Sequence, residues 1–445
     1  MSEVIAAARL AQRRWAASTL RQRLAVIAQL RLVMAENATH LAQLAAAPND
    51  RPLAEKLTSE VIPLLDACRF LERNAARILR PENFGARGRP LWLRGHSFTV
   101  ERRPFGVVLI VGPGNYPLFL AGVQLLQALV AGNAVLLKPA EGCSAPLQWL
   151  VGQLLERRLI DRDLVQILPE PPASAQEAVR AGVDKVIFTG SSENGRGFLA
   201  LLAEQNTPGI FELSGADLVI VRQDADLERA AKAIAFGRRL NAGDTCMAPR
   251  SVLVHENARI GLTSRLHELG LGELEVRAFA DDHAVLVLAR ENSYGLGASI
   301  FSADEEAARI LARQLPTGFV TINDLIAPTA DPRFPFGGVR ESGFGTTRGA
   351  DGLREFTYPH VIALRRGRAL PHLEETKTGD EELFGAYIKL VYGRNRDRIK
   401  SFRDFLWAAR RRGVAAGVSP ANSLAANTRA EDKIAASATG TNTGK

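Results

Sequence analysis

The sequence predicts an α/β fold with a parallel sheet, and two observations support this prediction. From residue 105 onward, short apolar runs alternate with segments of helical spacing. This alternation is typical of parallel strands that are covered by helices on both faces. Residues 105–137 contain no charged residue, but glycines, prolines and polar residues interrupt them. We therefore expect a strand, a loop, a buried helix and a strand in a Rossmann-type sheet rather than a membrane span.

The segments before this sheet have helical and hairpin patterns. Apolar residues at helical spacing predict one helical stretch over 5–47 and a second over 59–79, with Cys68 on the apolar stripe of the second. Residues 90–104 alternate apolar and charged side chains, which predicts an exposed hairpin.

The remaining elements follow in order along the chain. The expected strands are Val107–Val111, Ala134–Leu137, Leu164–Leu168, Lys185–Phe188, Gly209–Leu213, Leu218–Val221 and Ser251–His255. The expected helices are Leu118–Val130, Ala145–Leu159, Ser174–Ala181, Ser192–Glu204, Asp226–Asn241 and Ala258–Leu269.

Composition narrows the classes of function. Three cysteines among 445 residues indicate a reducing compartment rather than a disulfide framework. The N-terminus shows no secretory signal pattern, so we expect a cytoplasmic protein. The net charge is +8, but no zinc-finger or RNA-binding motif accompanies the basic residues, so no nucleic-acid partner is expected.

Cys246 is the candidate nucleophile. It lies among small and polar residues in the stretch 241–250, with Gly243 just ahead of it. A reactive cysteine needs room and backbone N–H donors, because the thiolate is the attacking species. A lone cysteine is more often structural, so the prediction depends on other stretches of the chain.

Five stretches provide that support. In chain order they are Gly112–Pro117, Leu136–Glu141, Phe188–Ser191, Phe211–Gly215 and Pro335–Gly343. Together with the cysteine stretch, they resemble the motifs of the aldehyde dehydrogenase superfamily: P-W-N-[FY]-P, K-P-x-E, F-T-G-S-x-x-x-G, E-L-G-G, G-Q-x-C-x-A and the late P-F-G-G-x-x-x-S-G. The resemblance runs from about Arg102 to about Leu364.

The resemblance implies a domain layout. Residues 1–89 and 105–215 would form the NAD(P)-binding domain, and 216–354 a shortened α/β catalytic domain. Residues 90–104 and 355–366 would be oligomerisation strands, with the first pairing with a late strand of a neighbouring subunit. A homodimer or larger homo-oligomer is therefore implied.

The resemblance also implies the chemistry. Cys246 would attack an aldehyde, the Asn115 amide and the Cys246 backbone N–H would hold the oxyanion, and Glu212 would activate water to release the acid. The stretch Gly243–Pro249 resembles fatty-aldehyde members of the superfamily, which implies a non-polar aldehyde.

The cofactor residues follow from the same resemblance. Lys138 and Glu141 would bind the adenosine ribose, and a carboxylate there favours NAD over the alternative, NADP. The pyrophosphate would lie near the helix that begins after Gly190 and Ser191 and runs through Gly195.

The sequence departs from the superfamily after Cys246. It has no E-x-F-G-P-V motif, and a block of at least one strand–helix–strand unit, about 30 residues, is missing relative to the superfamily. Counting back from Phe279 puts Glu268 at the position of the glutamate that binds the nicotinamide ribose, although Gly270 and Gly272 stand where Phe and Pro belong. The missing segment leaves one alternative open, a non-catalytic relative that binds or assembles. A CoA-acylating relative is a second alternative, and Glu212 argues against it because thiolysis needs no base for water.

The last residues extend beyond the resemblance. Residues 396–412 have a basic amphipathic pattern within a helical extension over 367–412. We expect this helix to pack on its own subunit, with peripheral membrane contact as the alternative. Residues 413–445 are rich in Ala, Ser, Asn, Thr and Gly and predict a disordered tail.

Overall fold

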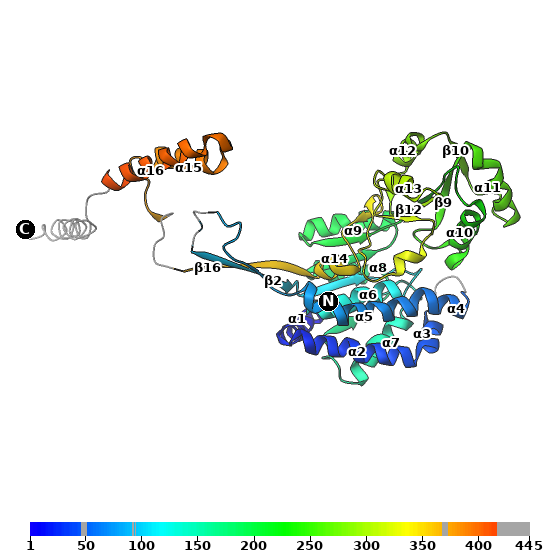
Figure 1. Ribbon diagram of the computed structural model, residues 1–445. Helices are drawn as coiled ribbons and strands as arrows, with labels where there is room; N and C mark the ends of the chain where they lie inside the picture. Colours follow the sequence, from blue (N-terminus) through cyan, green and yellow to red (C-terminus); the bar gives the residue numbers. More distant parts are fainter. Residues whose placement is uncertain (46–50, 91–92, 94, 367–372, 416–445) are drawn as a thin grey trace, which may run out of the picture. The chain divides into compact units, whose positions relative to one another are not determined.

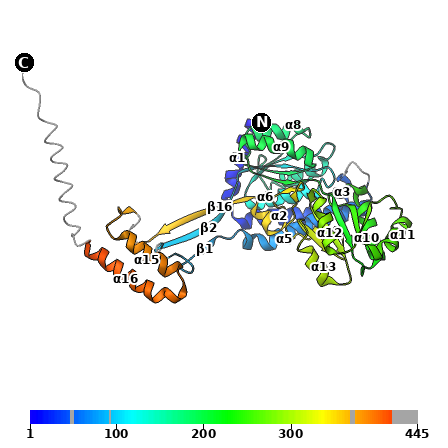
Figure 2. The same cartoon turned by 90° about the horizontal axis from the view of Figure 1, so that it is seen from above.

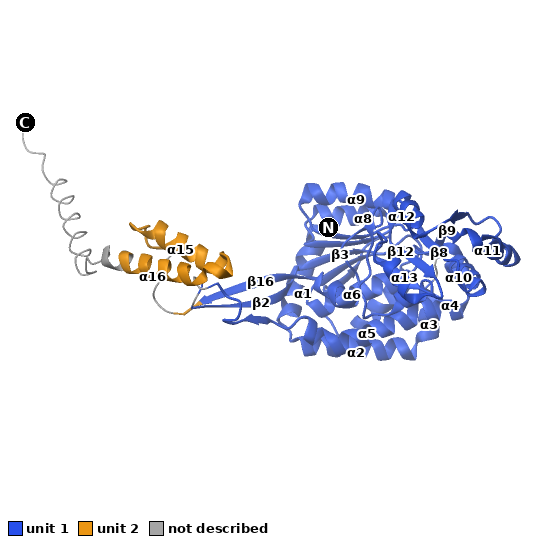
Figure 3. Ribbon diagram, turned by 45° about the horizontal axis from the view of Figure 1, so that its top comes forward, with its two compact units in different colours: residues 1–364 blue, residues 365–445 orange. Residues whose placement is uncertain are grey.

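The chain folds into two compact units in this computed structural model, which describes residues 1–45, 51–90, 93, 95–366 and 373–415. The first unit spans Met1–Leu364 and the second spans Arg365–Lys445 (Figure 3). The first unit contains every residue that the sequence analysis assigned to catalysis or cofactor binding.

The first unit contains a six-stranded sheet in the order β15-β7-β6-β3-β4-β5. All of its strands are parallel except β15, which pairs antiparallel with β7. The strands are β3 (Val107–Val111), β4 (Ala134–Lys138), β5 (Val165–Ile167), β6 (Lys185–Thr189), β7 (Gly209–Glu212) and β15 (Gly343–Phe344). Most of their residues are fully buried, which agrees with the uncharged runs in the sequence.

Helices cover both faces of this sheet. Figure 3 shows α8 and α9 on one side and α1, α2, α5 and α6 on the other, and Figure 1 labels the same helices. The helices are α1 (Ser2–Ala17), α2 (Leu20–Glu36), α3 (Ala38–Leu44), α4 (Leu53–Lys56), the π-helix Leu57–Val61, α5 (Ile62–Ile78), α6 (Phe119–Ala131), α7 (Ala145–Glu156), α8 (Pro172–Arg180) and α9 (Ser192–Gln205).

The single helical stretch expected over 5–47 is wrong, because the chain breaks it at Ser18 and Thr19. The Thr19 side chain accepts from the backbone N–H of Gln22, and the Gln22 side chain accepts from the backbone N–H of Thr19. This capping box satisfies two N–H groups at the start of α2 and so favours a new helix there.

A second parallel sheet has the order β10-β9-β8-β12-β13. Its strands are β8 (Asp217–Val221), β9 (Pro249–His255), β10 (Val276–Phe279), β12 (Gly297–Phe301) and β13 (Phe319–Ile322). Alternate residues of β8 face two separate cores: Val219 and Val221 pack with α10 and α11, and Leu218 and Ile220 with α12 and α13. Figure 2 labels these four helices. These helices are α10 (Leu227–Arg239), α11 (Glu256–Glu268), α12 (Asp282–Glu291) and α13 (Glu305–Ala312).

Short strands complete the first unit. The hairpin expected over 90–104 has only one of its strands in that range, because β2 (His96–Pro104) pairs antiparallel with the earlier strand β1 (Glu82–Phe84). Residues 91, 92 and 94 lie outside the described residues. The late strand expected to pair with the hairpin is β16 (Thr357–Arg365), which adjoins β2 in the same chain. The pairing expected between subunits is thus made within one subunit. The remaining elements are β11 (Tyr294–Gly295), β14 (Val339–Arg340), 3-10 turns at Leu240–Gly243 and Ala327–Ala330, and α14 (Gly349–Arg354).

The second unit is a pair of helices, α15 (Asp380–Tyr392) and α16 (Arg398–Ala415), joined by the 3-10 turn Asn395–Asp397. The start of the predicted disordered tail, residues 413–415, belongs to α16, and 416–445 lie outside the described residues. Across the described ranges, no helix is both long enough and apolar enough to cross a membrane.

Candidate active site

Two cavities of the first unit share a wall that contains Cys246 and Glu212. The first has a volume of about 820 Å³ and the second about 700 Å³. Leu120, Thr245, Cys246 and Glu212 line both of them. A side chain in this wall can therefore meet one molecule from each side.

The first cavity lies where the first sheet reverses its strand order. The chain builds β3, β4 and β5 outward on one side, then returns to place β6 and β7 on the other side of β3. Open α/β sheets bind ligands at the carboxyl ends of the strands next to such a reversal. Lys138 ends β4, Gly190 follows β6 and Glu212 ends β7, and all three line this cavity.

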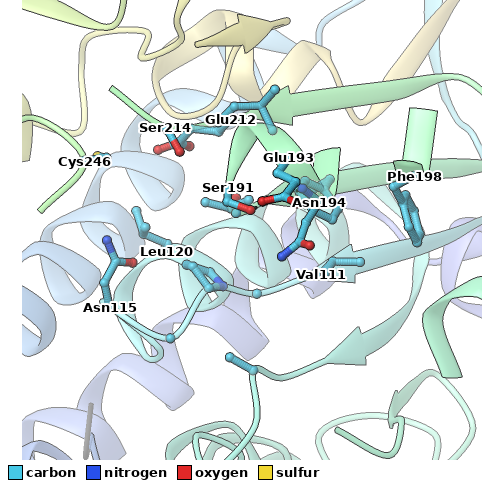
Figure 4. Close-up of a pocket in the computed structure, with 18 of the residues that line it drawn as sticks. Val111, Asn115, Leu120, Ser191, Glu193, Asn194, Phe198, Glu212, Ser214 and Cys246 are labelled. Carbon is cyan, nitrogen blue, oxygen red and sulfur yellow. Dashed lines mark hydrogen bonds between the residues drawn. The ribbon is translucent and has the colours of Figure 1, made fainter. Parts of the chain in front are cut away.

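The N-terminus of α9 opens into the first cavity (Figure 4). The Ser191 side chain caps the helix by accepting from the backbone N–H of Asn194 at 3.2 Å. The backbone N–H of Glu193 has no acceptor among the described residues. Because helix N-termini attract anions through such N–H groups, this end fits a phosphate group.

Gly195 does not line the cavity itself. A Cβ at this position would lie 2.5 Å from Cδ2 of Leu213, so its glycine lets α9 approach the chain after β7. Its role in this structure is therefore to place the helix N-terminus rather than to contact a ligand.

Lys138 and Glu141 lie on the same wall of the first cavity. Burial lowers the pKa of Lys138, and the charges of Glu141 and Glu170 oppose that shift. Glu170, which the sequence analysis missed, accepts from the backbone N–H groups of Gly142 and Ser144 at 2.9 and 3.2 Å. It thereby holds the turn that carries Glu141.

The loop before Cys246 has an unusual backbone. Asn241, Ala242 and Gly243 are consecutive residues with φ angles of 50°, 52° and 81°. For residues other than glycine this region costs about 1–2 kcal/mol each. The buried Asn241 holds the loop, because its Nδ2 donates to the Asn115 carbonyl at 2.9 Å and its N–H donates to Oε1 of Glu55 at 2.9 Å.

Asn115 lies on the cavity wall on the same side as Cys246 (Figure 4). Its Nδ2 donates to the Asp244 carbonyl at 3.1 Å. A side-chain amide nitrogen carries two hydrogens, so one remains for an oxygen near the thiol. The backbone N–H of Cys246 likewise has no acceptor among the described residues. The two donors predicted for an oxyanion therefore both remain available.

Cys246 is partly exposed, whereas Cys68 and Cys143 are buried. Burial of the sulfur raises the pKa of Cys246, and the negative charges of Glu212 and Asp217 raise it further. Arg348 opposes this shift. The thiol is thus neutral at rest, and its ionisation depends on nearby positive charge.

Glu212 is 3% exposed, and its Oε2 accepts from the Thr347 hydroxyl at 3.3 Å. Burial raises the pKa of Glu212, while the charge of Arg348 and the Thr347 hydrogen bond oppose the shift. A carboxyl group whose pKa is raised toward neutral pH is a better general base than an ordinary glutamate.

Arg348 is a residue that sequence reasoning missed. It is 5% exposed in the wall of the second cavity, with its guanidinium 4.0 Å from the ring centre of Phe336 and 5.6 Å from that of Phe119. Its Nη1 donates to the Thr329 carbonyl, but its Nε has no hydrogen-bond partner among the described residues. Its backbone has φ 60° and ψ 173°, a region that is almost restricted to glycine.

Asp217 is a second missed residue. It begins β8, is 6% exposed, and accepts from the backbone N–H of Gly297 at 3.0 Å. Burial raises its pKa to about 7, and this hydrogen bond opposes the shift. No sequence signal marked Asp217 or Arg348, because only long-range packing buries them.

The structure does not bring Glu268 to either cavity. It lies exposed at the C-terminal end of α11, on the second sheet. The assignment rested on counting back from Phe279 along the chain, but the residues after Glu268 form a turn that leads into β10. Of the residues assigned to the site, Cys246, Glu212, Asn115, Lys138, Glu141, Gly190 and Ser191 converge on the cavities.

Comparisons with known proteins agree with this geometry. A family model described as "Aldehyde dehydrogenase family" matches residues 1–269 and 274–362. The break between the two matched segments, residues 270–273, lies just after α11, in the region where the sequence lacks the E-x-F-G-P-V motif.

Two relatives align over most of the chain. A 4,4'-diapolycopene aldehyde oxidase from Methylomonas sp. is 27% identical over 472 aligned positions that cover 88% of this chain and 88% of the relative. A vanillin dehydrogenase from Pseudomonas fluorescens is 28% identical over 61% of this chain and 72% of its own.

A solved structure shares the fold. The aldehyde dehydrogenase of Mycobacterium tuberculosis complexed with NAD⁺ superposes with a TM-score of 0.75 at 22% identity, over 82% of this chain and 90% of that one. The family match covers most of the first unit and includes each residue that lines the shared wall. The chain belongs to the aldehyde dehydrogenase family.

Proposed function

We propose that this protein oxidises a non-polar aldehyde to the carboxylic acid, with NAD as the hydride acceptor. The observation that carries the proposal is the shared wall, where Cys246 and Glu212 line both cavities. A cofactor in the first cavity and an aldehyde in the second would then meet at the thiol.

In the proposed reaction Cys246 attacks the aldehyde carbon and forms a thiohemiacetal. The Asn115 amide and the Cys246 backbone N–H donate to the oxygen that becomes negative, as oxyanion donors do. NAD bound in the first cavity would supply the hydride acceptor. Loss of the hydride and of the hydroxyl proton from the thiohemiacetal would leave a thioester on Cys246. Glu212 then removes a proton from water, the water attacks the thioester, and the acid leaves as the thiol is restored.

The first cavity has the groups that a dinucleotide needs. The α9 N-terminus suits the pyrophosphate, and Lys138 and Glu141 suit the ribose hydroxyls. A carboxylate at Glu141 would repel a 2′-phosphate, which favours NAD over NADP. The NAD⁺ complex of the structural relative from M. tuberculosis is consistent with this choice.

The second cavity supports the non-polar substrate. Its walls carry mainly apolar side chains: Tyr116, Phe119, Leu120, Phe236, Leu240, Met247, Ile326 and Phe336. The burial of apolar surface is the main source of affinity in such a cavity. One of the relatives is named for a diapolycopene aldehyde and another for vanillin, and both of these compounds are aldehydes.

The proposal includes a homo-oligomer. β16 is at an edge of its three-stranded sheet, and it exposes Tyr358, Val361, Ile362 and Leu364. An exposed apolar edge strand is suited to pairing with another chain.

A second candidate function is a relative that binds the cofactor or assembles with other chains without turnover. The position of Glu268 at the end of α11 favours it, because no glutamate of α11 then reaches the nicotinamide ribose. Catalytic sites turn over more slowly when the residues around them do not hold the reacting groups in place.

The deciding experiment is NADH formation from a chain-length series of aldehydes, without CoA, with either NAD or NADP. We expect turnover that rises with chain length to a limit set by the second cavity. Cys246→Ser should lower turnover by about 10³-fold or more. Cys143→Ser is the matched control, because Cys143 is buried near the Gly114 carbonyl and takes no part in the reaction.

Two outcomes would contradict the proposal. Folded protein without turnover, but with a melting temperature raised by NAD, would favour the non-catalytic candidate. Turnover that survives Cys246→Ser would remove the thiol from the mechanism.

A further inference from the structure

The helix pair of the second unit has an apolar seam and one further apolar face. Ala386 on α15 and Ser401 and Ala408 on α16 are buried, and Tyr387 packs on Phe405 with ring centres 6.2 Å apart. The Arg411 guanidinium lies 3.8 Å from the Glu382 carboxylate, which brings the end of α16 beside the start of α15. The two helices are therefore antiparallel.

The exposed apolar side chains gather on one side of this seam. At 3.6 residues per turn, Phe384, Ile388 and Val391 lie next to the seam on α15. Because α16 runs in the opposite direction, Phe402 and Leu406 lie next to the seam on the same side. Each of these five side chains is 41–56% exposed. Together they form what we call the apolar face of the helix pair.

The opposite side of the pair is polar. It carries Glu382 and Lys389 on α15, and Lys400 and Arg411 on α16, with the Glu382–Arg411 ion pair across it. Trp407 is also exposed on this side, with the Arg411 guanidinium over its ring. The charged residues nevertheless dominate this side, and the helix pair is amphipathic as a whole.

The apolar face is bordered by positive charge. Residues 394–411 contain seven basic and two acidic residues. Arg403 and Arg410 are exposed and lie at the outer border of the apolar face on α16. Long arginine side chains at such a border keep their charge in the headgroup region while their stems cover apolar surface. A second copy on the same face would instead set these arginines against each other.

We propose that the α15–α16 pair lies flat on an anionic membrane surface, with the apolar face in the lipid and the arginines at the headgroups. Amphipathic helices with a basic border bind in this way, through apolar burial and attraction to anionic lipid. The inference stands apart from the proposed oxidation.

The test is cosedimentation of the full-length protein with large vesicles, without aldehyde or cofactor. We expect binding to phosphatidylcholine vesicles that contain phosphatidylglycerol, and binding about tenfold weaker or more to phosphatidylcholine alone. Phe402→Asn combined with Leu406→Asn should weaken binding by about tenfold or more without a change of charge. Trp407→Asn is the matched control, because Trp407 is also exposed on α16 but lies on the polar side, with Arg411 over its ring.

Circular dichroism of the variants establishes that the helices are retained. Absence of binding to anionic vesicles would overturn the proposal. It would also be overturned if the double variant lowered the mass measured by light scattering without vesicles, since a second copy would then cover the face. Equal loss of binding in Trp407→Asn would overturn it as well. None of these results bears on turnover, so failure here and failure of the proposed function are distinguishable.

Discussion

β3 and β8 each begin a run of five parallel strands, and in both sheets the chain adds two strands on one side before it crosses to the other. The two sheets nevertheless contribute to the site with opposite ends of their strands. The first sheet contributes carboxyl ends, where Lys138, Gly190 and Glu212 lie. The second sheet contributes amino ends, because Asp217 begins β8 and Cys246 precedes β9.

The difference teaches how binding and reaction are separated. At the carboxyl ends of parallel strands the chain enters helices, and the N-termini of these helices bind phosphate groups well. The loop of Cys246 lies at the amino ends of the strands of the second sheet. Its backbone includes residues in the left-handed region, and the buried carboxyl groups of Glu212 and Asp217 lie near the thiol. Changes near the thiol should therefore alter rate and pH dependence and leave cofactor binding intact. The first two of the following three predictions test that separation, and the third tests the buried carboxyl group of Asp217.

The largest effect is expected for Glu212→Gln, which removes the proposed base for water. Steady-state turnover should fall by about 10²–10³-fold, while one equivalent of NADH per site still forms in a burst. In the unchanged protein, turnover should fall as pH drops through the raised pKa of Glu212, because the protonated carboxyl cannot accept a proton. Rapid-mixing absorbance measures the burst, and its loss would assign Glu212 to an earlier step.

An intermediate effect is expected for Arg348→Met, which removes the buried positive charge beside Glu212 and Cys246. Both groups should then have higher pKa values, because Arg348 opposes both shifts. The acid limb of the pH–rate profile should move to higher pH, with about tenfold lower turnover at neutral pH. Arg348→Lys keeps the charge and should keep the profile. An unchanged profile in Arg348→Met, or a lost NAD-induced rise in melting temperature, would contradict the separation.

The smallest effect on turnover is expected for Asp217→Asn, whose consequence is for stability. Asp217 has a pKa of about 7 in the folded protein against an ordinary value of 3.8. Its carboxyl is therefore neutral in both states below about pH 4, and ionises first in the unfolded chain as pH rises. Relative to the variant, the wild-type protein should therefore have a free energy of unfolding that falls between about pH 4 and pH 7, by on the order of 1–4 kcal/mol.

Asparagine keeps an oxygen for the backbone N–H of Gly297. The Asp217→Asn variant therefore removes the charge and keeps the hydrogen bond. Denaturant titrations at several pH values measure the difference. A difference that is constant with pH would show that Asp217 is ionised in the folded protein.

Sequence patterns predicted the first sheet well, because its strands are short apolar runs that alternate with segments of helical spacing. The start of α2 was missed because the apolar spacing continues across Ser18, and only the capping box of Thr19 and Gln22 marks the boundary. The family resemblance is confirmed. The roles assigned to Cys246, Glu212 and Asn115 remain predictions that the structure makes geometrically feasible.

What sequence could not supply depends on contacts between distant residues. Arg348 is surrounded by Phe119 and Phe336, and no local pattern announces that a cation is buried there. Glu268 was assigned by counting along a chain that has lost a segment, and counting cannot follow a change of path in space. The omission of Arg348 and the wrong position of Glu268 have the same cause. The place of a residue in the site depends on the fold, and its position along the chain does not give that place.

The wall that the two cavities share has a consequence for inhibition. An aldehyde and a dinucleotide would approach Cys246 from different mouths, so each could enter or leave while the other stays in place. A single compound long enough to extend past Leu120 and Thr245 into both cavities would compete with both ligands at once. The kinetic signature of such a compound is simple: its inhibition is relieved by raising either the aldehyde or the cofactor alone.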